Sequence, residues 1–176
     1  MALYQRKYRI ESARWSGWDY SSDGTYFITI CTKPRVNVFG QIVNKKMVLS
    51  NQGIVVEECW GSIPLHYKNV GLGVVAIMPD HFHGIIILGG TTQSNTVETG
   101  HAPSLPTAEN RQNRPSLGNI IGSFKSAASN KIHSSGFPDF GWQERYNDRV
   151  IRDEPELKRI EKYIRDNPKN WKPRIS

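Results

Sequence analysis

The sequence predicts an α+β domain in which helices pack on an antiparallel sheet. Two apolar runs with high β propensity, residues 74–77 and 85–88, flank the turn pair Pro79-Asp80. A third β-rich run, TYFITICT, occupies residues 25–32. Elsewhere, apolar residues recur at the three- and four-residue spacing of helices that bury one face. Strands and helices therefore alternate along the chain in a way that is typical of a mixed, mainly antiparallel fold.

The first predicted elements are a strand, a short excursion and a helix. The strand over 25–32 follows a Ser-Ser-Asp-Gly turn, and residues 38–49 are expected to form a small hairpin or an irregular excursion. Ser50 or Asn51 can cap a helix that begins near Gln52 and ends before Pro64. We expect this helix to cover one face of the sheet. The residues that repeat at helical spacing in it are Ile54, Val55, Glu58, Cys59 and Ile63.

The two strands around Pro79-Asp80 come next, and a polar stretch follows them. From Gly89 to Pro115 the chain is rich in Gly, Thr, Ser, Asn, Pro and Gln and has almost no large apolar residue. Such a composition cannot offset the entropy lost on ordering by burial. We expect residues 89–115 to form a flexible surface loop.

The last part of the chain predicts a helix, a strand and a final helix. Ser116 caps a helix from Leu117 to about His133, which Gly136 and Pro138 end. Its predicted buried stripe is Leu117, Ile120, Ile121, Phe124, Ala128 and Ile132, with Lys125 and Lys131 facing outward.

A strand is then expected over 142–152, and Asp153 can cap a helix from Glu154 to about Asp166 with Pro155 in its first turn. The packing stripe of this final helix is Leu157, Ile160 and Ile164. The order of elements predicts a ferredoxin-like arrangement. Residues 1–176 are expected to form one domain with a basic leader over 1–20.

Composition favours a polyanionic partner. The 176 residues carry 23 Lys and Arg against 16 Asp and Glu, for a net charge of +7, and the sequence pI is about 9.5. Nucleic acid is the leading candidate. The N-terminus has no apolar signal region, and no segment approaches the length of a membrane span, so a cytoplasmic protein is expected. Cys31 and Cys59 have no zinc or disulfide spacing and are best explained as buried apolar side chains.

The most informative feature is the pair His81 and His83 at the start of the second strand of the predicted hairpin. Residues i and i+2 of a strand point to the same face, so the two imidazoles would point together while Phe82 points away. This is the geometry of a two-imidazole metal clamp. The alternative is that both histidines merely lie on a partly solvated face of the sheet.

Two polar residues of the final helix lie beside its apolar stripe. Tyr163 and Asn167 are one turn apart, so the tyrosine would be half-buried with its hydroxyl free to reach past the edge of the core. Taken alone, Tyr163 is more typical of an amphipathic residue at the core edge than of a nucleophile. Asn167, followed by Pro168, is also consistent with a simple helix end.

Six segments follow one another along the chain: TYFITICT, FGQIV, MPDHFHGIIIL, SLGNIIGSFKSA, WQERYNDRVIRDE and KYIRDNP. In this order they resemble the REP-associated tyrosine transposases, which belong with the single-tyrosine HUH transposases of small insertion sequences. The resemblance runs from about Tyr20 to Trp171. The ordered set is far more specific than any one segment.

The resemblance implies the HUH endonuclease fold, a divalent metal and a tyrosine nucleophile. His81 and His83 would bind Mg²⁺ or Mn²⁺, Asn167 would complete the metal site, and Tyr163 would attack DNA to form a covalent 5′-phosphotyrosine while a 3′ hydroxyl departs. This chain has Asp148-Arg149 where relatives often have a His after the acidic residue. Arg149 would then act as a phosphate contact.

Cations and aromatic rings that could hold DNA occur in three parts of the chain. Cations bind the DNA backbone and aromatic faces stack on bases, although any one of these residues could instead be a solvated charge or a packing anchor. The candidates are Arg6, Lys7, Arg9, Arg14, Trp15 and Trp18 in the leader, Lys125 in the second helix, and Trp142, Arg145, Arg149 and Arg152 before the final helix.

Three functions are compatible with these features. The first is an enzyme that nicks single-stranded DNA and transfers strands, acting on hairpins of repetitive extragenic palindromes in the bacterial nucleoid. The second is a domesticated protein that binds DNA hairpins without cleaving them. The third, a replication initiator or relaxase, is disfavoured by the short chain. The active unit could be a monomer or a homodimer.

Overall fold

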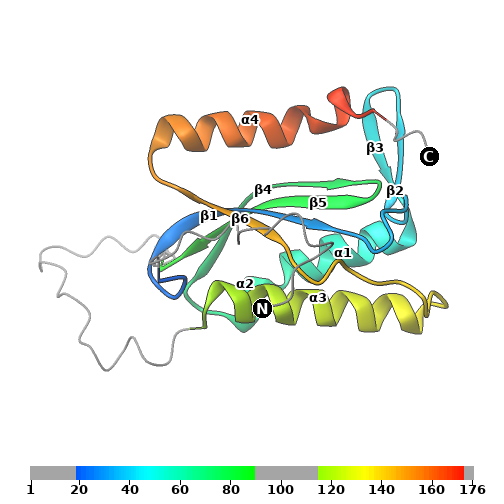
Figure 1. Ribbon diagram of the computed structural model, residues 1–176, viewed down its shortest axis with the longest axis horizontal. Helices are drawn as coiled ribbons and strands as arrows, with labels where there is room; N and C mark the ends of the chain where they lie inside the picture. The colour runs from blue at the N-terminus through cyan, green and yellow to red at the C-terminus, as the bar shows by residue number, and fades with distance from the viewer. Residues whose placement is uncertain (1–18, 90–114, 173–176) are drawn as a thin grey trace, which may run out of the picture.

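A computed structural model describes residues 19–89 and 115–172 as a four-stranded antiparallel sheet between two layers of helices (Figure 1). The strands run in the order β4-β5-β1-β6, and β2 and β3 form a separate hairpin. The strands are β1 (Gly24–Cys31), β2 (Gly40–Val43), β3 (Lys46–Leu49), β4 (Val70–Met78), β5 (His81–Leu88) and β6 (Asn147–Ile151). The helices are α1 (Asn51–Gly61), α2 (Ile63–His66), α3 (Leu117–Ser134) and α4 (Glu154–Asn170). The predicted antiparallel sheet with packed helices is confirmed.

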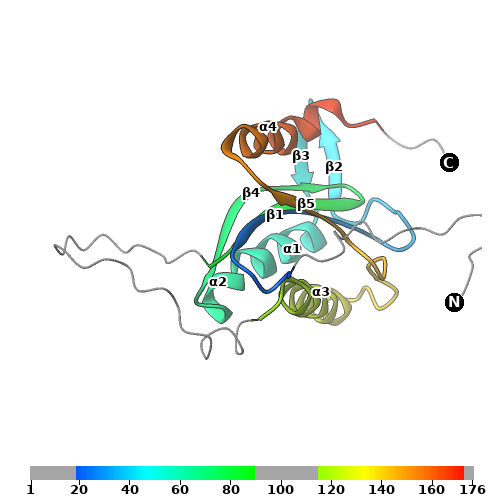
Figure 2. The ribbon, with the colours of Figure 1, turned by 60° about the vertical axis from the view of Figure 1, so that its left-hand side comes forward.

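The two faces of the sheet are covered unequally. Among residues 19–89 and 115–172, helices α1, α2 and α3 lie on one face of the sheet and α4 lies on the other (Figures 1 and 2). The β2-β3 hairpin stands beside the C-terminal end of α4. It is closed by Asn44 and Lys45, whose positive φ angles of 50° and 62° are those of a two-residue hairpin turn. The hairpin alternative for residues 38–49 is therefore correct.

Strand β5 is central and carries the histidine pair at its start. It pairs with β4 through the Pro79-Asp80 turn, with Met78 opposite His81, and with β1 on its other side. Alternation places His81, His83 and Ile85 on the face that α4 covers, while Phe82 packs into the core on the opposite face. The predicted strand pair and its register on the two faces are confirmed.

The larger core lies between the sheet and the α1/α3 layer. Helix α3 buries the predicted stripe in full: Leu117, Ile120, Ile121, Phe124, Ala128 and Ile132. The Ser116 hydroxyl caps this helix by accepting from the Asn119 N–H. The face of α1 differs from the prediction, because Ile54 is 43% exposed while Gln52, Val56 and Trp60 are buried. The large Trp60 ring packs against the Phe82 ring, with centroids 4.6 Å apart, and so determines which face of α1 is turned to the core.

Helix α1 ends before Pro64 as predicted, but Pro64 itself lies in the first turn of α2, where its missing N–H costs nothing.

Helix α4 begins as predicted and ends later than predicted. The Asp153 carboxylate accepts from the Glu156 N–H, and Pro155 lies in the first turn. Ile164 is fully buried against Ile85 and Ile151. The helix continues through Pro168 to Asn170 instead of ending near Asp166. Pro168 lacks an N–H and its ring crowds the carbonyl four residues earlier, so it weakens the last turn, which nevertheless continues to Asn170.

Strand β6 is shorter than predicted, since it spans Asn147–Ile151 instead of 142–152. Trp142 forms only an isolated bridge with Thr32. The carbonyls of Gln143 and Glu144 accept hydrogen bonds from the Lys125 ammonium at 2.8 and 3.1 Å. These carbonyls are directed to α3, so they do not extend the sheet ladder.

Candidate functional site

The two histidines of β5 converge on one point. The Nε2 atoms of His81 and His83 lie 3.1 Å apart. Both residues are buried, with exposed fractions of 7% and 4%. Their rings meet nearly edge to face, with centroids 4.6 Å apart. The sheet therefore presents two ring nitrogens to the same position on the face that α4 covers.

Each Nδ1 atom has its own partner. His81 Nδ1 lies 2.6 Å from Asp80 Oδ1, and the Arg35 Nε–H donates to Asp80 Oδ2 at 2.9 Å. His83 Nδ1 lies 2.9 Å from the hydroxyl of Thr29, its neighbour across the ladder in β1. Outer partners of this kind orient histidines that bind metals.

Helix α4 brings Tyr163 to the same place. The Tyr163 ring lies edge-on to His83, with centroids 5.4 Å apart, and 6.1 Å from the Phe27 ring. The residue is 52% exposed. Its ring thus borders the histidine pair, and about half of the residue is accessible to solvent.

Asn167 lies between two residues that contact the histidines. It follows Tyr163 by one turn and precedes Trp171 by one turn. The Trp171 ring, just past the helix end, lies 5.6 Å from the His81 ring. Because positions four apart in a helix share a face, Asn167 is expected on the same face of α4 as Tyr163.

The arrangement fits a divalent metal ion. Two nitrogen ligands about 2.1 Å from an ion and at a right angle to each other are separated by about 3.0 Å, which is close to the 3.1 Å between the Nε2 atoms. Within residues 19–89 and 115–172, no group of three His, Cys, Asp or Glu side chains is arranged to hold a metal.

Burial and neighbouring charges shift two pKa values at the site. The pKa of His83 falls to about 3, first because of burial and then because of the charges of His81 and Arg35. Burial alone would raise the pKa of Asp80, but hydrogen bonding and charge interactions with His81 and Arg35 outweigh it and lower that pKa. Near neutral pH, the Asp80 carboxyl group is therefore expected to be ionised and the His83 ring to be neutral.

The His83 shift predicts that the metal-free protein loses stability in mild acid. His83 in the unfolded chain binds a proton near pH 6.5, whereas in the folded chain it does so only near pH 3. Between these values the unfolded state binds more protons, so the free energy of unfolding falls as the pH falls, by up to about 1.4 kcal/mol per pH unit. Urea unfolding in EDTA at pH 7.5, 6.5 and 5.5 measures this slope, and His83→Gln should reduce it. An equal slope in both proteins would contradict the assignment.

Not all predicted DNA contacts are placed where DNA could reach them. Arg6, Lys7, Arg9, Arg14, Trp15 and Trp18 lie outside the described residues. Trp142 is buried among Phe39, Phe124 and Phe140, and its Nε1–H donates to the Lys125 carbonyl. The Lys125 ammonium does not face outward as predicted, since it donates to backbone carbonyls and burial lowers its pKa. Lys125 and Trp142 therefore hold the segment after α3 in place.

We expect Lys125→Met to destabilise the fold without a selective loss of DNA affinity. The variant leaves two backbone carbonyls without their charged donor, at a cost of about 1–3 kcal/mol. Chemical denaturation measures that cost, and a hairpin-binding titration at low temperature measures affinity. Arg145→Ala is the comparison, because Arg145 is exposed on the same segment. Weaker DNA binding by Lys125→Met than by Arg145→Ala would contradict the structural role.

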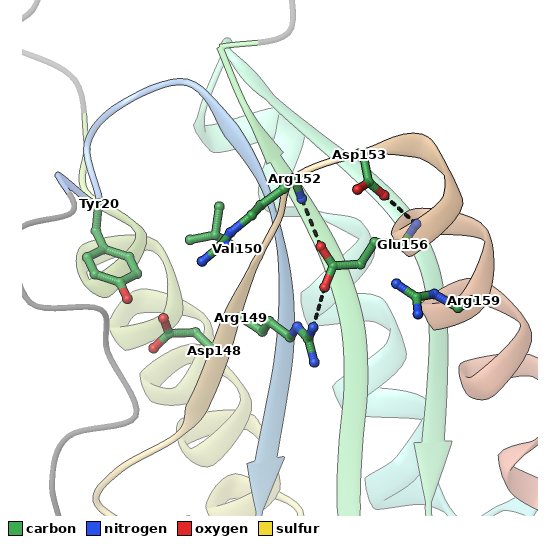
Figure 3. A pocket seen from close by; sticks show the side chains of 8 residues that line it. All are labelled: Tyr20, Asp148, Arg149, Val150, Arg152, Asp153, Glu156 and Arg159. Carbon is green, nitrogen blue, oxygen red and sulfur yellow. Dashed lines mark hydrogen bonds and ion pairs between the residues drawn. The ribbon is translucent and has the colours of Figure 1, made fainter.

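Arg149 and Arg152 line a pocket of about 440 Å³ between β6 and the start of α4 (Figure 3). Arg149 is paired with the buried Glu156 carboxylate at 2.5 Å, and that carboxylate also accepts from the Arg152 backbone N–H at 3.0 Å. The hydrogen bond from the Arg152 N–H, helped by the charge and hydrogen bond of Arg149, lowers the pKa of Glu156 although burial opposes them. Glu156 thus ties the first turn of α4 to β6, two turns before Tyr163. The pocket is lined by Tyr20, Asp148, Arg149, Val150, Arg152, Asp153, Glu156 and Arg159.

Comparison with known proteins finds a relative by sequence and a solved structure of similar fold. No family model matches the chain. An uncharacterized protein of Haemophilus influenzae strain Rd is 34% identical over 162 residues, which cover 91% of this chain and 88% of that protein. The chain belongs to the same family as this Haemophilus protein.

Among solved structures, a REP-associated tyrosine transposase bound to a REP hairpin matches 96% of this chain and 73% of its own, with a TM-score of 0.50 and 16% identity. The chain therefore shares the overall fold of this transposase, which agrees with the mixed helix and antiparallel sheet predicted from the sequence. Within residues 19–89 and 115–172, no helix is long and apolar enough to cross a membrane.

Sequence reasoning missed several residues around the site. Asp80 was assigned only to the turn, although a carboxylate adjacent to a His-x-His pair is itself a signal for an outer partner. Thr29 and Arg35 come from β1 and the segment after it, and only strand pairing brings them to the histidines. Glu156 and Trp171 lie at the two ends of α4, and no pattern in the sequence marked them as neighbours of the site.

Proposed function

We propose that this protein nicks single-stranded DNA and transfers the cut strand through a covalent 5′-phosphotyrosine on Tyr163, with a divalent metal as cofactor. The observation that carries the proposal is the position of the Tyr163 ring, edge-on to His83 above two converging imidazole nitrogens. A nucleophile beside a metal-binding pair is the minimal set of groups for cutting a phosphodiester bond.

His81, His83 and Asn167 would hold Mg²⁺ or Mn²⁺. When bound, the ion would stabilise charge on the phosphate oxygens and on the phenolate. Two imidazoles and one amide oxygen leave open positions for oxygens of the substrate and for water. The half-exposed position of Tyr163 lets DNA approach the hydroxyl from solvent.

The proposed reaction is a transesterification at phosphorus. Tyr163 Oη forms a bond to phosphorus as the bond from phosphorus to the 3′ oxygen breaks. The phenolic proton passes to solvent, and the departing 3′ oxygen takes up a proton, so the 3′ hydroxyl is free. The phosphotyrosine conserves the bond energy, so a 3′ hydroxyl of another strand can displace Tyr163 without ATP.

The proposed substrate is DNA that forms hairpins, specifically repetitive extragenic palindromes. The net charge of +7 suits a polyanion, and the fold relative was solved with a REP hairpin. Action on chromosomal repeats would place the protein at the nucleoid.

The test is incubation with Mn²⁺ and a hairpin oligonucleotide labelled at its 3′ end, because the adduct would retain the strand downstream of the cut. We expect a labelled protein band that survives a denaturing gel and is absent when EDTA is added first. Hairpin binding with no such band at any metal concentration would instead favour the non-cleaving DNA-binding alternative.

A further inference from the structure

We propose that Asp80, held by Arg35, is a positioning residue that fixes the tautomer of His81, while Thr29 lets His83 change its tautomer when the metal binds. This inference rests on the proposed metal role of the histidine pair. It assigns different parts to the two histidines, which the His-x-His pattern alone treats as equivalent.

Asp80 is held rigidly from three sides. Its backbone carbonyl accepts from the Thr32 N–H at 3.1 Å and from the Thr32 hydroxyl at 3.0 Å. Its side chain is 3% exposed, and each carboxylate oxygen has one partner, His81 Nδ1 for Oδ1 and Arg35 Nε for Oδ2. Asp80 therefore has little freedom to turn away from His81.

This arrangement determines where His81 carries its proton. A carboxylate paired with a guanidinium only accepts hydrogen bonds, so the proton of the 2.6 Å contact belongs to His81 Nδ1. In the neutral ring, Nε2 then presents a lone pair. His81 is thus set as a metal ligand before any ion arrives.

Thr29 does not impose such a choice on His83, because a hydroxyl both donates and accepts. Without an ion, His83 Nε2–H can donate to His81 Nε2 across 3.1 Å while the Thr29 hydroxyl donates to His83 Nδ1. With an ion bound, His83 would instead carry its proton on Nδ1, where the Thr29 hydroxyl would accept the hydrogen bond, and Nε2 would have released its own proton to solvent. Two lone pairs facing each other across 3.1 Å would repel, so this exchange relieves the metal-free pair.

The test compares wild type with the double variant Arg35→Met/Asp80→Leu and with Thr29→Val. Arg35 and Asp80 form a partly buried ion pair, and replacing both members by apolar groups of similar size costs less than removing one, so the double variant is expected to fold. The control is Lys125→Met, which is expected to lose stability at a position on the other face of the sheet. Melting temperature, Mn²⁺ affinity by calorimetry and the ¹⁵N spectra of the histidine rings are measured for each protein.

In the metal-free wild type we expect His81 protonated at Nδ1 and His83 at Nε2. In the double variant, His81 should lose its Nδ1–H form, and Mn²⁺ affinity should fall by about 10- to 100-fold. Thr29→Val should weaken Mn²⁺ binding while His81 keeps its Nδ1 proton. Lys125→Met should leave both the spectra and the affinity unchanged.

An unchanged His81 tautomer and unchanged Mn²⁺ affinity in the double variant would overturn the inference. If wild type binds no Mn²⁺, the metal part of the proposed function fails, and the ring spectra of the metal-free proteins still decide whether Asp80 sets the His81 tautomer.

Discussion

Tyr163→Phe is expected to abolish the covalent protein–DNA adduct while leaving hairpin binding within about twofold of wild type. Phenylalanine keeps the ring that packs against His83 and Phe27 and removes only the hydroxyl. Loss of a nucleophile typically lowers a reaction by at least about a thousandfold. The adduct is measured on denaturing gels with a 3′-labelled hairpin, and binding by a fluorescence titration in Mn²⁺.

The matched control for this variant is Tyr67→Phe. The Tyr67 hydroxyl bonds the Ser123 hydroxyl at 2.9 Å in the helical layer on the other side of the sheet. This variant should form adduct at the wild-type rate. Adduct formation by Tyr163→Phe would exclude Tyr163 as the nucleophile.

His83→Ala is expected to remove metal-dependent cleavage. If the two imidazoles are the proposed metal ligands, loss of one weakens metal binding and removes charge stabilisation worth several kcal/mol in the transition state, so the rate should fall by about a hundredfold or more. The measurement is the initial rate of adduct formation across a Mn²⁺ titration, with His81→Ala as a parallel variant. Both should also show weaker Mn²⁺ binding by calorimetry.

The control for the histidine variants is His133→Ala. His133 Nε2 contacts the Phe140 carbonyl at 2.8 Å on the far side of the sheet from the pair. Its loss should leave the metal titration curve unchanged. Wild-type cleavage that continues in excess EDTA would contradict a metal role for His81 and His83.

The positions of His81, His83 and Tyr163 could be predicted from the sequence, because two short-range periodicities determine which way these side chains face. Alternation in β5 sets which way His81 and His83 point, and the stripe ending in Ile164 sets the face of α4 beside which Tyr163 lies. Burial of both apolar faces then brings the helix and the strand together. Both patterns can be recognised in a single sequence.

The remaining features depend on pairings between distant segments. Arg35 reaches Asp80 across 45 positions, and Thr29 meets His83 across 54, so no local pattern reveals either contact. In the sequence, Lys125 and Trp142 resemble surface residues. No local pattern shows that backbone carbonyls surround the Lys125 ammonium or that the Trp142 ring lies in the core. The observed ends of some helices and strands differ from the predicted ends for the same reason, as the shorter β6 shows.

The most direct test of the account is to locate the phosphate in the adduct itself. After cleavage in Mn²⁺, the adduct is digested with nuclease and trypsin, and the peptides are sequenced by mass spectrometry. The account predicts a nucleotide phosphate on the Tyr163 oxygen, in the peptide that ends at Arg165. A phosphate on another residue, or complete cleavage with no modified peptide, would contradict it.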